Sequence, residues 1–494
     1  MLKKLFAQTF IYGLATVLPR MLSFLLLPLY TDILATAGFG SVTVIFSWFA
    51  LFNVFLAYGM ETAFFRFYSS EKEPIKVIST SLLALLFSSV LFVFVAVNSL
   101  PTLEALTEIE PQYLGYAVGI MALDALVVIP FAKLRAQEKT MQYALLKTAN
   151  VGLNLGLNVL FLVGLPYLAA QGAPLSQALN TGAQNNVLGT FYLPDFEISY
   201  IFIANLIASA STFLLLIGSY KDLFKGFDFS LFKRMLRYGL PVMIAGVAFS
   251  INEVFDKILL VKLLPASVAT SELGKYAACY KLALFMTLFA TAFRMGIEPF
   301  FFSHAKTQNP QKAYAVITQY FVLFGSVIFL AVVVFSDLLK ELLIRNSDYW
   351  EAMSVVPLIL LASFFLGIYH NLSVWYKVTD QTHYGAYISL LGAAITLSVN
   401  YLFIPTMGYY AAAIATLAAY GTMMVASYLL GRKKYPIPYP LARMSVYIIA
   451  AVTFAGTSFY VFPGSLWVGV PLFLLFVLTL AYFEYKNLKK ILSP

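Results

Sequence analysis

The chain has 494 residues, of which 61% are hydrophobic and only 11% are charged, and its formal net charge is +9. Soluble globular domains carry about 25% charged residues. With a mean hydropathy of +0.83, this composition excludes a soluble protein and predicts a polytopic membrane protein. The single cysteine, Cys279, excludes an internal disulfide framework, and with three scattered histidines no metal site is expected.

Apolar runs of a length that can cross a bilayer recur along the chain, separated by polar interruptions. Continuous apolar runs differ from the alternating pattern of a transmembrane β-barrel. The predicted fold is therefore all-α and polytopic. Fourteen transmembrane helices are expected, over residues 9–32, 41–67, 77–99, 113–133, 143–167, 197–219, 238–262, 273–300, 313–335, 352–376, 384–404, 409–430, 443–461 and 465–484.

Basic residues concentrate on one side of this predicted topology. The termini and the even-numbered connections hold most of the 32 Lys and Arg residues, whereas the stretches 100–112 and 166–199 contain none. The positive-inside rule therefore predicts that both termini are cytoplasmic. Membrane lipids are the expected partners of this charge, and nucleic acid is not, because the basic residues form no single face.

The middle of the chain divides into two parts that differ in character. Residues 221–237 mix Phe with five Lys and Arg residues, the composition of an amphipathic segment in a membrane interface. From residue 238 an apolar helix is expected, and it carries Asn252, Glu253, Asp256 and Lys257. Ionisable side chains inside a membrane helix usually face a partner, a bundle interior or a water-filled pathway.

A repeat suggests the domain organisation. Tyr12-Gly13-Leu14 opens the first expected span and Tyr238-Gly239-Leu240 opens the seventh, each after a basic segment. Six spans, a basic connection and six more spans predict two parallel six-helix lobes related by an axis along the membrane normal. The predicted organisation is a lobe at 1–220, a cytoplasmic linker at 221–237, a lobe at 238–431, and two final helices with a tail at 432–494. The polar stretch 167–196 is expected to be an outer loop.

The opening segment LPRMLSFLLLPLYTDILATAGFGSVTVIFSWFALF and the central segments FDFSLFKRMLRYGLPV, INEVFDKILL and LGKYAACYKLALF carry a family resemblance. They resemble the polysaccharide transport branch, the Wzx-type O-antigen and capsule flippases, of the multidrug/oligosaccharidyl-lipid/polysaccharide exporter superfamily. The resemblance implies a flippase in the bacterial inner membrane that moves undecaprenyl-pyrophosphate-linked oligosaccharide outward by alternating access of two lobes. A polysaccharide polymerase and chain-length machinery are the implied protein partners.

Three basic residues within expected spans are candidates for binding a pyrophosphate in a cavity between the lobes: Arg20, Lys281 and Arg294. Positive charge suits a diphosphate, and Arg adds bidentate geometry. The alternative for each is an ion pair, for instance Arg294 with Glu298 one helical turn away.

Acidic and amide side chains form a second group of candidates. Asp124 is expected near the middle of its span without a partner in its own helix, which favours proton coupling. Glu253, Asp256 and Lys257 share one face, so a gate or structural pair and the binding of a coupling ion, H+ or Na+, are both open. Asn150, Asn154 and Asn158 form a polar stripe, which suits either helix packing or hydrogen bonds to sugar hydroxyls.

Other functions remain open. A small-molecule or cation antiporter of the same superfamily would need a carboxylate-lined cavity, and a peptidoglycan-precursor flippase would belong to the same class. A membrane glycan polymerase or ligase would need acid and base residues in a large outer loop, and the stretch 167–196 has Asp195 as its one such acid. No catalytic residue and no cofactor is therefore expected.

Overall fold

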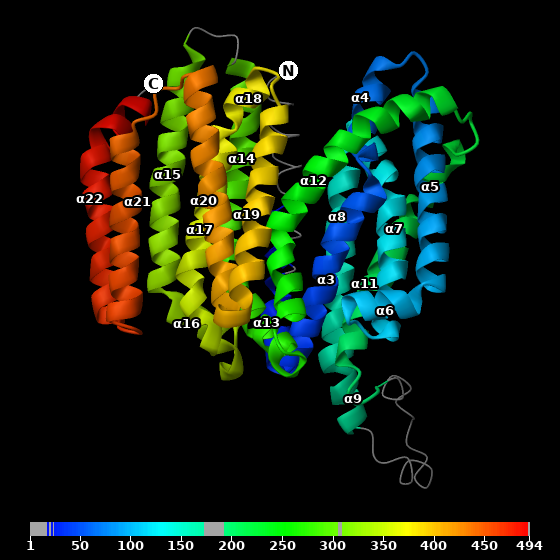
Figure 1. The fold of residues 1–494 in the computed structure, drawn as a ribbon, viewed down its shortest axis with the longest axis horizontal. Coiled ribbons are helices and arrows are strands. Elements are labelled where there is room, and N and C mark those ends of the chain that lie inside the picture. The colour runs from blue at the N-terminus through cyan, green and yellow to red at the C-terminus, as the bar shows by residue number, and fades with distance from the viewer. Residues whose placement is uncertain (1–16, 19–20, 23, 172–191, 305–308, 493–494) are drawn as a thin grey trace. The chain divides into compact units, whose positions relative to one another are not determined.

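A computed structural model gives the structure of the chain and describes residues 17–492, except 19–20, 23, 172–191 and 305–308. The described residues form helices and connecting turns, with no strand among them (Figure 1). The all-α prediction is confirmed. The chain divides into two compact units, residues 1–250 and 251–494.

The first unit contains the helices that precede the division, and part of α12. Its α7 packs against α3, α5 and α11, and so forms the centre of the unit. The elements are α2 (Leu26–Ile33), α3 (Thr36–Ala57), α4 (Met60–Ser70), α5 (Pro74–Asn98), α6 (Leu100–Thr107), α7 (Pro111–Ala136), α8 (Thr140–Val159), the π-helix η1 (Leu160–Gly164), α9 (Leu165–Gln171), α11 (Glu197–Leu216), the 3₁₀-helix η3 (Ile217–Asp222) and α12 (Phe229–Leu263).

The second unit is built around α17, which packs against α14, α15 and α20. Within this unit α21 and α22 lie beside α15 (Figure 1). The elements are α13 (Ala266–Tyr280), the 3₁₀-helix η4 (Lys281–Ala283), α14 (Leu284–His304), α15 (Pro310–Val334), α16 (Ser336–Leu343), η5 (Ser347–Val355), α17 (Val356–Leu372), α18 (Val374–Val378), α19 (His383–Met407), α20 (Tyr409–Lys434), α21 (Leu441–Gly456), the π-helix η6 (Thr457–Val461) and α22 (Leu466–Leu492).

Twelve helical segments of the described chain are long and apolar enough to cross a membrane, and each coincides with one of the expected spans. Of the two other expected spans, 9–32 lies partly outside the described residues. The other, 238–262, lies inside α12, which has 35 residues. The total of fourteen spans stays a prediction.

Helix α12 joins two segments that the sequence analysis separates. The linker residues from Phe229 onward and the expected seventh span form one continuous helix, although Pro241 lies within it. The division between the units falls at Ser250 and Ile251, inside this helix. The boundaries proposed at 220, 237 and 431 stay predictions. Of the expected outer loop 167–196, residues up to Gln171 continue α9, and 172–191 lie outside the described residues.

Close packing between backbones joins α12 to the first unit. Tyr58 (φ 31°) and Gly59 (φ 73°) interrupt the helix between α3 and α4. A Cβ added at Gly59 would lie 2.1 Å from the carbonyl oxygen of Gly239 in α12. Glycine is therefore required at position 59 both by the left-handed backbone and by the lack of space.

Candidate functional site

A cluster of polar side chains surrounds α12 where this helix runs through the second unit. The Nδ2 of Asn252 donates to the carbonyl of Ser389 at 3.1 Å, and the hydroxyl of Thr396 donates to the Oδ1 of Asn252 at 2.9 Å. The hydroxyl of Tyr420 donates to the Oε1 of Glu253 at 2.8 Å. Helices α19 and α20 thus supply partners for the polar residues of α12.

Asp256 and Lys257 form a buried ion pair at the centre of this cluster. The Nζ of Lys257 lies 3.0 Å from the Oδ1 of Asp256, and the two residues are 8% and 1% exposed. The hydroxyl of Tyr276 donates to the other carboxylate oxygen at 2.7 Å, while the ring centroid of Tyr280 lies 4.1 Å from the lysine nitrogen. These contacts compensate for the cost of removing both charges from water.

The pairing differs in one respect from the pattern suggested by helical spacing. Glu253 and Lys257 are one turn apart, but Lys257 donates to the backbone carbonyl of Glu253, at 3.0 Å. The carboxylate of Glu253 instead bonds with Tyr420. Lys257 therefore neutralises Asp256, its neighbour in sequence, rather than Glu253.

Lys281 lies beside this cluster and differs from Lys257 in its surroundings. It is the first residue of η4, a 3₁₀ turn that interrupts the membrane-spanning segment Ala266–Ile297. Its side chain is exposed, and it pairs with no carboxylate among the residues that the structure describes. Lys257 lies within electrostatic range. A lysine at membrane depth with a second cation nearby and no acid of its own can attract an anion.

Of the other two predicted cations, Arg294 lies within the described residues and Arg20 does not. Arg294 is half-buried in α14, and His370 of α17 lies within electrostatic range of it. The side chain of Glu298 is outside the described part of the chain, so the ion-pair alternative for Arg294 stays open. Arg20 also lies outside the described residues.

Asp124 has partners on two neighbouring helices of the first unit. Ser209 of α11 donates to its Oδ1 at 2.8 Å, and Lys147 of α8 is within electrostatic range. The nitrogen of Lys147 also lies 4.4 Å from the ring centroid of Phe131. The sequence analysis did not single out Lys147, although its position inside an expected apolar span was a sufficient signal.

Two asparagines of the polar stripe on α8 make hydrogen bonds to other helices. Asn150 donates to the hydroxyl of Thr212 in α11 at 2.8 Å, and Tyr30 of α2 donates to the Oδ1 of Asn158 at 2.9 Å. Asn158 in turn donates to the side chain of Asn154 at 2.9 Å. These contacts favour the helix-packing role for Asn150 and Asn158, whereas Asn154 is half-exposed and keeps its own amide donors for other partners.

A buried amide in the second unit was also missed. Asn400 of α19 is 0% exposed, and its Nδ2 donates to the carbonyl of Thr396 at 2.8 Å. Its Oδ1 has no hydrogen-bond partner in the described structure. Buried acceptors are usually satisfied, so this oxygen is one that a proton donor or a cation can use. No spacing rule applied to the sequence alone distinguishes Asn400 from an ordinary polar residue of a helix.

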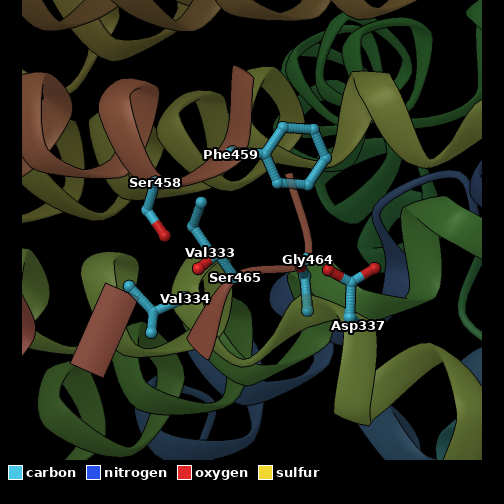
Figure 2. Close-up of a pocket in the computed structure, with 8 residues that line it drawn as sticks. Val333, Val334, Asp337, Ser458, Phe459, Gly464 and Ser465 are labelled. Atoms are coloured by element: carbon cyan, nitrogen blue, oxygen red, sulfur yellow. The ribbon is translucent and has the colours of Figure 1, made fainter. Parts of the chain in front are cut away.

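A small pocket lies elsewhere in the second unit, where the end of α15 meets η6 and the start of α22 (Figure 2). The side chains of Asp337, Ser458 and Phe459 line it, together with Gly464. None of the predicted site residues lines this pocket, and Asp337 is paired with Lys340. Within the described residues, no group of three or more His, Cys, Asp or Glu side chains is arranged to hold a metal ion.

A family model and solved structures identify the family and the fold, respectively. The family model described as "Polysaccharide biosynthesis protein" matches residues 5–304. A solved structure titled "Lipid II flippase MurJ, inward closed conformation" is similar with a TM-score of 0.72 at 15% identity, covering 97% of this chain and 100% of that one. An inward-facing multidrug resistance MATE family transporter of the MOP superfamily has a TM-score of 0.61 at 14% identity, covering 89% and 95%. No curated protein sequence matches the chain.

Proposed function

Because the chain belongs to the polysaccharide biosynthesis protein family and has the fold of MOP superfamily transporters, we propose that it is a flippase for lipid-linked oligosaccharide. Its substrate is an oligosaccharide on undecaprenyl pyrophosphate, moved across the bacterial inner membrane for O-antigen, capsule or exopolysaccharide synthesis. Both termini are cytoplasmic in this proposal. A polysaccharide polymerase and chain-length machinery receive the product on the outer side.

Lys281 is the observation that carries the proposal. An ionisable group at membrane depth costs at least ~2.5 kcal/mol on insertion scales unless it has a function or a partner. Lys281 is exposed and has no acidic partner in the described structure, and its electrostatic neighbour is the cation Lys257. Because Lys257 is already paired with Asp256, an entering diphosphate chiefly supplies the negative charge that Lys281 lacks. Arg20 and Arg294 are the further cations that we assign to the same anion.

Coupling to an ion gradient is the second part of the proposal. The carboxylate of Asp256 already has a lysine and a tyrosine as partners, so we assign it a gating role together with Lys257. Glu253 and Asp124 bond to single hydroxyl groups and are the acids that can exchange a proton. For Na+, the unsatisfied Oδ1 of Asn400 offers a neutral oxygen ligand. No cofactor and no catalytic step is part of this mechanism.

Two functions of the same fold compete with this one. The half-buried Glu253 and the buried Asp256 favour a cation antiporter, since a cationic cargo needs carboxylates. Asp256, however, is already neutralised by Lys257. A peptidoglycan-precursor flippase would move a different headgroup on a lipid pyrophosphate and so belongs to the same class. A membrane polymerase or ligase is the remaining alternative, and the fold supports transport instead.

Deletion of the gene tests the proposal directly. We expect surface polysaccharide to be lost and undecaprenyl-linked oligosaccharide to accumulate on the cytoplasmic leaflet of the inner membrane. Extracted lipid-linked oligosaccharides would be quantified by mass spectrometry, and their leaflet would be determined by accessibility to a membrane-impermeant glycosidase. Unchanged lipid-linked pools, together with altered export of cationic dyes, would favour the antiporter. Accumulated peptidoglycan precursor would identify the other flippase.

A further inference from the structure

Three large aromatic side chains face outward from the turn between η3 and α12. Phe224, Phe227 and Phe229 are 86%, 48% and 69% exposed, and together they form what we call the aromatic ridge. Exposing aromatic surface to water is costly, at about 25 cal/mol per Å². A ridge of three such rings therefore indicates a contact surface.

The opposite side of the same segment is fixed in the core of the first unit. Leu223, Leu231 and Met235 are 8%, 2% and 0% exposed and pack in a hydrophobic cluster with residues of α4, α5 and α7. The backbone is held as well. Ser79 donates to the carbonyl of Leu223 at 2.5 Å, and the N–H of Asp228 donates to the hydroxyl of Thr80 at 3.1 Å. The outward direction of the ridge therefore follows from the packing of the unit.

The segment that carries the ridge also carries an excess of positive charge. Lys221, Lys233 and Arg237 are exposed and have no carboxylate partner in the described part of the chain. Other cations of the segment are paired, Lys225 with Asp222 at 2.7 Å and Arg234 with Glu71 at 2.7 Å. The free cations thus form an excess of positive charge on the same segment as the exposed rings.

The length of α12 places this segment near the membrane surface. Its 35 residues span about 52 Å, whereas the hydrocarbon layer is about 30 Å thick. At least one end of α12 therefore extends beyond the hydrocarbon. The first turns are its basic end, with Lys233, Arg234 and Arg237, and the positive-inside rule assigns that end to the side of the basic loops. The first turns lie there beside the ends of α4 and α5 (Figure 1).

We propose that the aromatic ridge inserts into the lipid leaflet on this side and that Lys221, Lys233 and Arg237 bind anionic lipid headgroups. Aromatic rings at the acyl boundary with cations at headgroup level are the two components of interfacial binding. The lipid contact anchors the start of α12, the helix that also carries Asp256 and Lys257. This inference does not depend on the cargo of the transporter.

A spin label on the ridge tests the insertion. Phe224→Cys in a Cys279→Ser background would carry the nitroxide, and Lys433→Cys on the exposed end of α20 is the matched control. The full-length protein would be reconstituted in phosphatidylcholine vesicles and in vesicles that also contain phosphatidylglycerol. At position 224 we expect greater accessibility to oxygen than to a water-soluble nickel complex, and deeper insertion with phosphatidylglycerol. Preferred access of the nickel complex in both lipids would overturn the proposal.

Charge removal tests the lipid specificity. Lys221→Gln with Lys233→Gln would be compared with Lys433→Gln with Lys434→Gln, which changes the net charge equally. Each lysine near a surface contributes about a fivefold preference for anionic lipid, corresponding to ~1 kcal/mol. The Lys221→Gln, Lys233→Gln variant should therefore reduce the enrichment of spin-labelled phosphatidylglycerol around the protein. The control variant should reduce this enrichment less. An equal loss of phosphatidylglycerol enrichment in the two variants would contradict a specific lipid site. So would inorganic phosphate, added to phosphatidylcholine vesicles, if it changed the spectrum of the label at position 224 as phosphatidylglycerol does.

Discussion

At the scale of single residues, the ion pair of Asp256 and Lys257 combines burial with mutual neutralisation. Removing one member strands the other charge in the buried interior, which typically costs ~3–5 kcal/mol. We expect Asp256→Asn and Lys257→Met each to lower membrane abundance and the unfolding temperature in detergent. The double variant should recover much of the loss, because no isolated charge remains.

The exposed pair of Glu73 and Lys76 is the control for this experiment. Their side chains are 60% and 43% exposed, so Glu73→Gln should cost at most ~1 kcal/mol. If the losses of Asp256→Asn and Lys257→Met simply add in the double variant, the pair is not an electrostatic unit.

Lys281 should behave in the opposite way. Its replacement strands no carboxylate of the described structure, so Lys281→Gln should leave abundance near normal and abolish surface polysaccharide. Lys281→Arg keeps the charge and should retain part of the activity. Immunoblots of the membrane and of the glycan measure the two quantities separately. Lys433→Gln, on an exposed helix end, controls for the loss of one positive charge. Normal glycan display in Lys281→Gln would remove Lys281 from the substrate site.

At the scale of elements, the contact between Gly59 and Gly239 holds the first part of α12 against the junction of α3 and α4. A Cβ at position 239 would lie 2.8 Å from the carbonyl oxygen of Tyr58, so the two backbones must separate to admit a methyl group. We expect Gly239→Ala to destabilise the protein by ~1–3 kcal/mol. Gly218→Ala, where a Cβ meets no atom within 4 Å, should change stability by about 0.5 kcal/mol or less. Thermal unfolding measures the stability of both variants. Equal stability of Gly239→Ala and Gly218→Ala would show that the two backbones are not in close contact.

The sequence predicts the elements better than their connections. Continuous apolar runs identify the positions of twelve helices, because length and hydropathy suffice for that purpose. The same pattern separates the linker from the seventh span at Tyr238, where the composition changes, although α12 continues through this point. Met235, which appears interfacial by composition, is buried in the core. Composition reports the average surroundings of a segment, whereas the packing of one face depends on distant helices.

The candidate site also depends on tertiary contacts that the sequence pattern does not predict. Charges at Glu253, Asp256 and Lys257 indicate that partners are needed, but Tyr276 and Tyr420 come from α13 and α20. Their roles depend on tertiary contacts that no spacing rule encodes. Lys147 could have been identified from the sequence alone, because a lysine inside an apolar span is unusual by itself.

At the scale of the whole molecule, the uneven distribution of charge predicts the orientation in the membrane. Single cysteines introduced into a Cys279→Ser background would be labelled with a membrane-impermeant maleimide. Residues in 169–195 should react from outside, and residues in 432–440 should react only after the membrane is opened. Reversed labelling would overturn the cytoplasmic position of the termini and the proposed direction of transport. Cys279 is buried and its thiol donates to the carbonyl of Tyr349 at 3.4 Å, so a serine hydroxyl at this position keeps a hydrogen-bond acceptor and should be tolerated at modest cost.

The π-helix η1 affects how the chain tolerates insertions and deletions. Its residues Leu160–Gly164 form wider turns than an α-helix, so the segment holds roughly one residue more than regular winding needs. Deleting one residue there would restore the regular winding and leave the residues after it on their present faces, because the wide turn absorbs the extra residue. The same deletion in the regular part of α8 would turn everything after it by about 100° around the helix axis. Asn150, Asn154 and Asn158 precede η1, and α9 follows it. The gene can therefore lose a codon at η1 without changing how either segment faces its neighbours.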